Sequence, residues 1–155
     1  MLLNRRQLAG LAVAVFLATP AWAADDRGTK DEAIALANAA ATHVKAVGAD
    51  QAFADFTNDK AQWSKKDLYV VALDATGTAK AHGANAKMVG KSLIALKDQN
   101  GKEFIKEMVS VGTGKGEGWV DYEWVNPVSK KVEGKSTYVK RLAGTSELVG
   151  VGIYR

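Results

Sequence analysis

Gly118-Trp-Val-Asp-Tyr-Glu-Trp-Val-Asn-Pro127 decides the fold, together with Lys135-Ser-Thr-Tyr-Val-Lys-Arg-Leu142. Both stretches alternate in the manner of β-strands, in which residues i and i+2 lie on the same face. We expect strands over residues 119–125 and 136–142, joined by a polar hairpin loop. A short turn then leads into a last strand over residues 148–154.

Upstream of these strands the chain carries a second strand pair and a helical crossover. Residues 67–73 are rich in β-branched and aromatic side chains, which favour strands. The turn at residues 74–77 predicts that residues 78–82 return as an antiparallel strand. Apolar residues at helical spacing over residues 104–111 predict one short amphipathic helix.

The domain begins with helices. Thr29 and Glu32 match a capping box, in which each side chain would satisfy a free backbone amide at the start of the helix. Apolar residues at helical spacing follow over residues 34–47, and Gly48 is the expected helix end. A second helix is expected over residues 50–56. Helices followed by two strands, a helical crossover and three strands indicate an α+β fold with an antiparallel sheet.

The N-terminus has the three zones of an export signal. Residues 4–7 include two arginines, residues 8–18 are apolar, and residues 21–23 fit the small-x-small cleavage rule. We therefore expect a signal peptide over residues 1–23, and a single mature domain over residues 24–155 that is located in the periplasm. The Sec and twin-arginine routes both stay open. An uncleaved anchor helix is the alternative, although the apolar run is short for a membrane span.

Composition excludes several functions. The formal charge of the whole sequence is +4. Without Arg5 and Arg6 there are 19 basic and 17 acidic residues, so the net charge is only slightly positive. Basic and acidic residues are interspersed, so we expect no nucleic-acid partner. The chain has no cysteine, which excludes disulfides and thiolate metal sites. After Leu17 no second long apolar run occurs, so we expect no transmembrane span in the mature chain.

Several pieces of the sequence, in their order and spacing, carry a family resemblance. They are Asp67-Leu-Tyr-Val-Val-Ala-Leu-Asp74, Ala81-His82, Val89-Gly-Lys-Ser-Leu93, Gly116-Glu-Gly-Trp-Val-Asp-Tyr-Glu-Trp124, Lys135-Ser-Thr-Tyr-Val-Lys140 and Val149-Gly-Val-Gly-Ile-Tyr154. The chain from about Thr29 onward resembles a single Cache domain, the PAS-like extracytoplasmic sensor module of bacterial chemoreceptors and histidine kinases. The resemblance implies a long N-terminal helix packed on a five- to six-stranded antiparallel sheet.

The resemblance also implies a function in ligand binding. Cache domains of this type bind small molecules, often two- or three-carbon carboxylates, in a pocket over the sheet. Two departures from the family's receptors stand out. Gly83 replaces the usual proline after the histidine, and the sequence ends at Arg155, where a receptor would continue into a transmembrane helix.

Five residues are candidates for the ligand site. Tyr122 and Trp124 share a face of one predicted strand, and Tyr138 and Lys140 share a face of the next. Lys140 could pair with a carboxylate, the two phenols could donate to it, and Trp124 could form a pocket wall. His82, at a strand end, could hydrogen-bond the ligand or respond to pH. Each also has a purely structural interpretation: a solvated lysine, core tyrosines, a satisfied histidine.

No catalytic, metal or cofactor site can be assembled from the sequence. Asp121 and Glu123 share a face, but the solvated side of an amphipathic strand explains them more simply. His43 and His82 are a poor metal pair without cysteine, and the glycines of residues 112–118 lack the sequence of a phosphate loop. We therefore expect a binding protein with no cofactor and no enzymatic activity.

Two functions compete. The first is a soluble periplasmic sensor that binds a small organic anion. The second is a ligandless interaction module that docks on a membrane-bound receptor, kinase or transporter. Dimerisation through the long helix is possible in either case.

Overall fold

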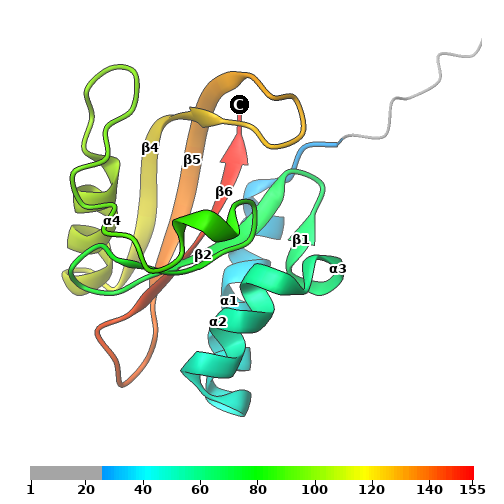
Figure 1. Cartoon of the computed structure of the whole chain (residues 1–155), viewed down its shortest axis with the longest axis vertical. Coiled ribbons are helices and arrows are strands. Elements are labelled where there is room, and N and C mark those ends of the chain that lie inside the picture. Colours follow the sequence, from blue (N-terminus) through cyan, green and yellow to red (C-terminus); the bar gives the residue numbers. More distant parts are fainter. Residues whose placement is uncertain (1–25) are drawn as a thin grey trace, which may run out of the picture.

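The computed structural model describes residues 26–155 (Figure 1). The predicted signal peptide over residues 1–23 lies outside this part, so its cleavage and the mature start stay predictions. Among the helices of the described part, none combines the length and the apolar character that a membrane crossing requires.

One antiparallel sheet of six strands forms the centre of the domain. The strands are β1 (Ser64–Lys65), β2 (Leu68–Leu73), β3 (Ala79–His82), β4 (Glu117–Val125), β5 (Val132–Arg141) and β6 (Leu148–Tyr154). Their order is β1-β2-β6-β5-β4. Strands β1 and β3 both pair with the edge of β2 that faces away from β6: β1 pairs with the beginning of β2 and β3 with its end. Strand β6 therefore lies in the middle of the sheet, between β2 and β5, which explains why all of its residues are buried.

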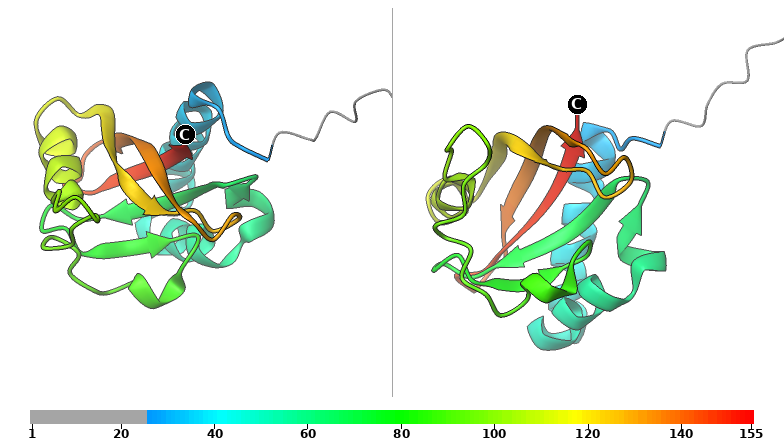
Figure 2. Two further views of the ribbon diagram at one scale, coloured as in Figure 1. Left: turned by 90° about the horizontal axis from the view of Figure 1, so that it is seen from above. Right: turned by 45° about the horizontal axis from the view of Figure 1, so that its top comes forward.

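Helices cover the two faces unequally. The helical elements are α1 (Lys30–Val47), α2 (Ala49–Asn58), α3 (Lys60–Trp63), the 3₁₀ turn η1 (Ala86–Met88) and α4 (Phe104–Thr113). Figure 2 shows α1 behind the central strands, whereas α4 and the segment that carries η1 lie on the opposite face. Each face has its own hydrophobic core, one under α1 and α2 and one under α4. The predicted α+β architecture, with a long N-terminal helix on a six-stranded sheet, is confirmed.

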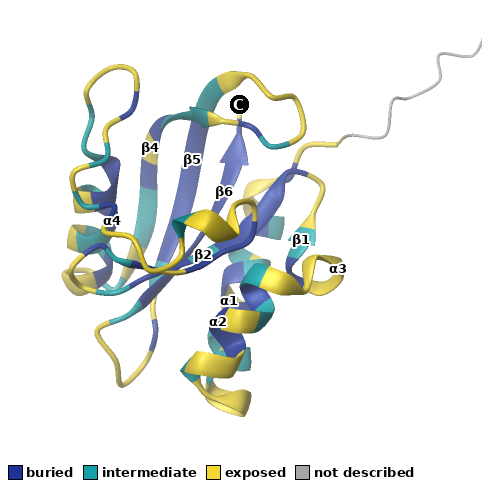
Figure 3. Cartoon of the chain, viewed as in Figure 1, coloured by how far each residue is buried: buried dark blue, intermediate teal, exposed yellow. Residues whose placement is uncertain are grey.

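Helix α1 starts as its sequence predicts. The Glu32 amide donates to the Thr29 hydroxyl (3.2 Å), and the Thr29 amide donates to the Glu32 carboxylate (2.9 Å). Ala33, Ala37 and Ala40 then face the sheet and are fully buried. These small side chains allow the helix backbone to lie close to β6 and β5, the central strands that Figure 3 shows in the dark colour of buried residues.

The structure adds two elements that local patterns did not predict. Helix α3 is one turn long and β1 has two residues, and elements this short have no measurable sequence period. Both depend on the tertiary structure: Trp63 is buried in the core under α2, and Ser64 pairs with Tyr69 of β2.

Candidate ligand-binding pocket

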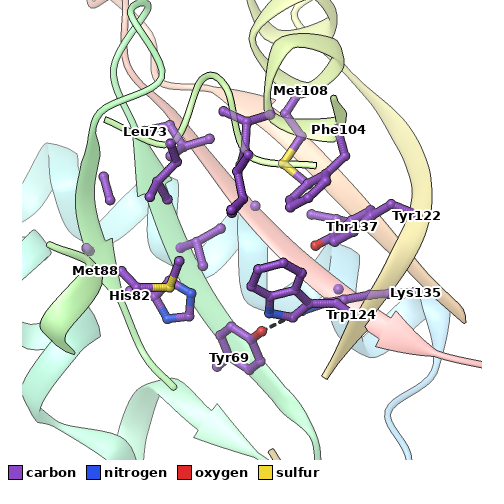
Figure 4. Close-up of a pocket in the computed structure, with 18 residues that line it drawn as sticks. Tyr69, Leu73, His82, Met88, Phe104, Met108, Tyr122, Trp124, Lys135 and Thr137 are labelled. Atoms are coloured by element: carbon purple, nitrogen blue, oxygen red, sulfur yellow. Dashed lines mark hydrogen bonds between the residues drawn. The ribbon is translucent and has the colours of Figure 1, made fainter. Parts of the chain in front are cut away.

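A pocket lies between the sheet and the segment that carries η1 and α4 (Figure 4). It has a volume of about 30 Å³. Most of its lining is aliphatic or aromatic, with methionine sulfur from Met88 and Met108. The hydroxyl, imidazole and ammonium groups in the lining belong to Tyr69, His82, Tyr122, Lys135 and Thr137. An apolar lining with a few convergent polar groups is typical of small-molecule sites.

Lys135 of β5 brings an ammonium group into this pocket, and the residue is only 3% exposed. Its Nζ donates to the hydroxyl oxygens of Tyr69 (2.7 Å) and Tyr154 (3.2 Å). The same nitrogen lies 4.1 Å and 4.6 Å from the centroids of these two rings. The Tyr154 hydroxyl donates in turn to the carbonyl of Val125 (2.9 Å). Figure 4 marks the hydrogen bond between Lys135 of β5 and the hydroxyl of Tyr69 of β2.

These contacts leave the charge of Lys135 uncompensated. Burial lowers the pKa of Lys135 to about 7, and the attraction of Asp67 only partly opposes this shift. Burial also raises the pKa of the Tyr69 and Tyr154 hydroxyls, so both stay neutral. Within residues 26–155 no carboxylate forms an ion pair with Lys135. Lysines are rarely buried without such a partner, because burial of the unpaired charge costs free energy of folding. Groups with pKa values perturbed in this way cluster at functional sites.

Glycines in β6 make room for this lysine. A Cβ atom on Gly152 would lie 2.1 Å from Cε of Lys135 and 2.6 Å from Oγ1 of Thr137. A Cβ atom on Gly150 would lie 3.0 Å from Cγ2 of Thr137. Lys135 therefore reaches Tyr69 on β2 by crossing β6, which lies between β5 and β2, at a position without a side chain.

Replacing Gly152 by alanine is therefore expected to destabilise the protein. The new methyl group meets both Lys135 and the buried Thr137, and overpacking of this kind costs about 1–3 kcal/mol. Urea unfolding of the purified variant measures this loss. Gly134→Ala is the matched control in β5, because its Cβ would meet only the Arg155 guanidinium, at 3.2 Å, and this group can move away. Equal stability of the two variants would contradict the packing argument.

His82 adds a neutral hydrogen-bond donor to the pocket. Its Nδ1 accepts from the Asn85 amide (3.0 Å), so the neutral ring carries its proton on Nε2. Burial and the nearby Lys135 lower the pKa of His82 to about 4, which keeps the ring neutral near pH 7. The ring stacks on Tyr69 with a centroid distance of 5.3 Å.

Aromatic rings form the wall on the side of α4. Phe104 stacks on Tyr122 with centroids 4.2 Å apart and planes inclined by 3°. Trp124 packs against Phe104 at 5.3 Å. The Tyr122 hydroxyl bonds to Oγ1 of Thr137 (2.9 Å), so this phenol already has a partner inside the protein.

The structure brings three of the five candidate residues together. Tyr122, Trp124 and His82 line the pocket. Tyr138 and Lys140 do not, and the expectation that all of these residues share one pocket needs correction. Their binding roles themselves stay predictions.

Strand register explains the difference. Tyr122 pairs with Lys135, and Trp119 pairs with Tyr138. Directly paired residues of an antiparallel sheet share a face, so Tyr138 and Lys140 belong to the opposite side of the sheet from Tyr122.

On that opposite side Tyr138 and Lys140 have a partner of their own. The Tyr138 hydroxyl donates to Glu117 (2.8 Å), and Lys140 forms an ion pair with the same carboxylate (3.1 Å). Tyr138 also belongs to the core under α1, where its ring packs against Trp119. Both side chains are thus satisfied without a ligand.

Sequence reasoning missed the central lysine for a specific reason. The strand predicted from the sequence begins at residue 136, whereas β5 begins at Val132 and includes Lys135 well inside the sheet. The signal that could have pointed to it is the Gly150-Val-Gly152 alternation of β6, which places two glycines on one face. No cluster of three His, Cys, Asp or Glu side chains between residues 26 and 155 is placed to hold a metal ion.

Residues 10–155 match the family described as Single Cache domain 2. The chain belongs to the single Cache domain 2 family. This Cache domain is 29% identical over 73 residues to the methyl-accepting chemotaxis protein McpP of Pseudomonas putida. The match covers 47% of the chain and 13% of that chemoreceptor, so the Cache domain spans only a small part of this relative.

Solved structures agree with this assignment. A methyl-accepting chemotaxis protein from Vibrio parahaemolyticus superposes on this Cache domain with a TM-score of 0.68 at 26% identity, covering 81% of this chain and 87% of that one. A Cache chemosensory domain that recognises carboxylic acids superposes with a TM-score of 0.67 at 22% identity, covering 80% and 91%. The latter likeness shows the shared fold.

Proposed function

We propose that this protein is a periplasmic sensor domain whose pocket binds a small organic anion, such as a two- or three-carbon carboxylate. The observation that carries the proposal is the buried ammonium of Lys135, which enters a small apolar pocket with neutral phenols as its bonded partners. A bound carboxylate would supply the missing negative charge. It would also favour the protonated lysine, because an opposite charge nearby raises the pKa of an amine.

The donors of the pocket suit such a ligand. An ammonium group has three N–H donors, and Tyr69 and Tyr154 accept two of those of Lys135. One donor therefore stays available. His82 offers the Nε2 proton in addition, and this nitrogen has no hydrogen-bonding partner among the residues that the structure describes.

The size of the pocket favours a short ligand. One buried water needs about 10–15 Å³ of comparable volume, and the pocket provides about 30 Å³. This space admits a few non-hydrogen atoms. Beyond the carboxylate, the apolar wall of Phe104, Tyr122 and Trp124 would contact a methyl or ethyl group. The carboxylic acid recognition of a structural relative is consistent with this ligand class.

A thermal-shift series tests the proposal, with acetate and propionate compared against acetamide and propionamide. The amides match the acids in size but lack the charge. At 100 times its dissociation constant, a ligand of the folded state adds about 2.7 kcal/mol of stability. We expect the acids to raise the melting temperature clearly and the amides to leave it nearly unchanged. Equal shifts, or none for any short acid, would contradict the proposal.

One observation favours a second function, docking on a membrane-bound receptor, kinase or transporter. Val125, Val128 and Val132 at the β4–β5 hairpin are 48%, 53% and 50% exposed. Exposed apolar side chains that gather in one place indicate a contact surface. If no small acid shifts the melting temperature, this second function is favoured. A crosslinker placed on the β4–β5 hairpin, in cells that export the protein, would then identify the partner.

A further inference from the structure

The Lys135 amine is placed for covalent as well as ionic chemistry. We infer that Lys135 reacts reversibly with small aldehydes and ketones, forming an imine inside the pocket. This inference deepens the proposed function, and it rests on the same pocket being open to small molecules. It adds an uncharged ligand class, the carbonyl compounds, to the anions proposed above.

The surroundings of Nζ favour this reaction. The group lies in an apolar pocket, and its hydrogen-bonded partners are the hydroxyls of Tyr69 (2.7 Å) and Tyr154 (3.2 Å). Within the described residues no carboxylate is paired with Lys135 to hold it as an ammonium. An uncharged carbonyl compound of two or three carbons also enters an apolar lining without losing the hydration of a charge.

Lys135 differs from a solvated lysine in the fraction of its amine that is neutral near pH 7. Burial lowers the pKa of Lys135 to about 7, so about half of its amines are neutral at pH 7. A solvated lysine with a pKa of about 10.4 is neutral in about one molecule in 2,500 at that pH. Only the neutral amine has the lone pair that attacks a carbonyl carbon. Desolvated lysines with lowered pKa are the ones that form Schiff bases.

The reaction balances with the groups present. The nitrogen lone pair forms the C–N bond, and the electrons of the C=O π bond move to the oxygen. That oxygen takes up a proton, for which the Tyr69 hydroxyl next to Nζ is a suitable donor, and a nitrogen proton is released to restore the phenol. The resulting carbinolamine loses water to form the C=N bond. In sum, amine and aldehyde give imine and water, and no oxidant or reductant is needed.

Reductive trapping tests the inference on the wild-type protein. Limiting acetaldehyde and cyanoborohydride at about pH 7 convert an imine into a stable N-ethyl lysine, which peptide mass spectrometry locates. We expect Lys135 to be labelled at least tenfold faster than Lys140, the matched lysine on the same strand that is paired with Glu117. In urea, where the pocket is lost, the two lysines should react at similar rates.

Competition separates this inference from the proposed function. Excess acetate should slow labelling of Lys135 and leave Lys140 unaffected, because the acid occupies the pocket. If acetate stabilises the protein but Lys135 is labelled no faster than Lys140, the carbonyl chemistry is wrong and the anion site stands. If Lys135 is labelled selectively while no acid stabilises the protein, the carbonyl chemistry stands and the anion proposal is wrong.

Discussion

Replacing Lys135 by methionine is expected to abolish the stabilisation of the protein by acetate or propionate. Methionine keeps the length and the apolar stem but removes the ammonium, which is the positive charge in the pocket. Without it the carboxylate would be buried unpaired, at a cost of several kcal/mol that a ligand of this size cannot recover. The loss should appear in calorimetric titration as well as in the thermal shift.

Lys140→Met is the matched control for this experiment. Lys140 lies on the same strand, but on the opposite face and beside Glu117, so its loss should leave ligand binding unchanged. The Lys135 variant should still fold, because an apolar side chain of similar size replaces a buried charge, a change that is often neutral or stabilising. Binding that survives in Lys135→Met and disappears in Lys140→Met would reverse our assignment of the site.

Raising the pH from about 6 to about 9 is expected to increase the free energy of unfolding of the unliganded protein. The cause is the titration of Lys135. Its pKa is about 7 in the folded protein and about 10.4 in an unfolded chain. Between these values the unfolded state holds a proton that the folded state has released. Stability therefore rises with pH in this window, by up to about 1.4 kcal/mol per pH unit. Urea unfolding at several pH values measures the slope.

Ligand affinity should respond to the same titration with the opposite sign. A carboxylate binds the ammonium form, so its affinity should be nearly constant from about pH 5.5 to about pH 6 and fall towards tenfold per unit above pH 7. His82, with a pKa of about 4, is neutral across this range and does not contribute.

Lys135→Met should flatten the part of the stability slope that this lysine causes. An unchanged slope in that variant would contradict the role of Lys135.

Much of the fold follows from local patterns. The capping box at Thr29 starts α1, and the alternation of residues 119–125 forms most of β4. These features could be predicted because helix caps and strand alternation act over a few neighbouring residues. The same alternation placed Tyr122 and Trp124 on one face, where the structure has them.

The composition of the site depended on contacts between distant segments. Sequence alternation shows which residues of one strand share a face, but it does not show how the faces of two strands match. That match depends on register, and a shift of one residue reverses it. Because Tyr122 pairs with Lys135, these two residues share the face that carries the pocket, and Lys140 lies on the opposite face. Gly152, far along the chain, then provided the space in which the lysine crosses to Tyr69.

The sequence by itself therefore determined the longer elements, the fold class and the shared face of Tyr122 and Trp124. Only the tertiary structure decided which lysine is buried. The physical reason is that the cost of burying an ammonium depends on its surroundings, here β2, β5 and β6, which come together only in the folded sheet.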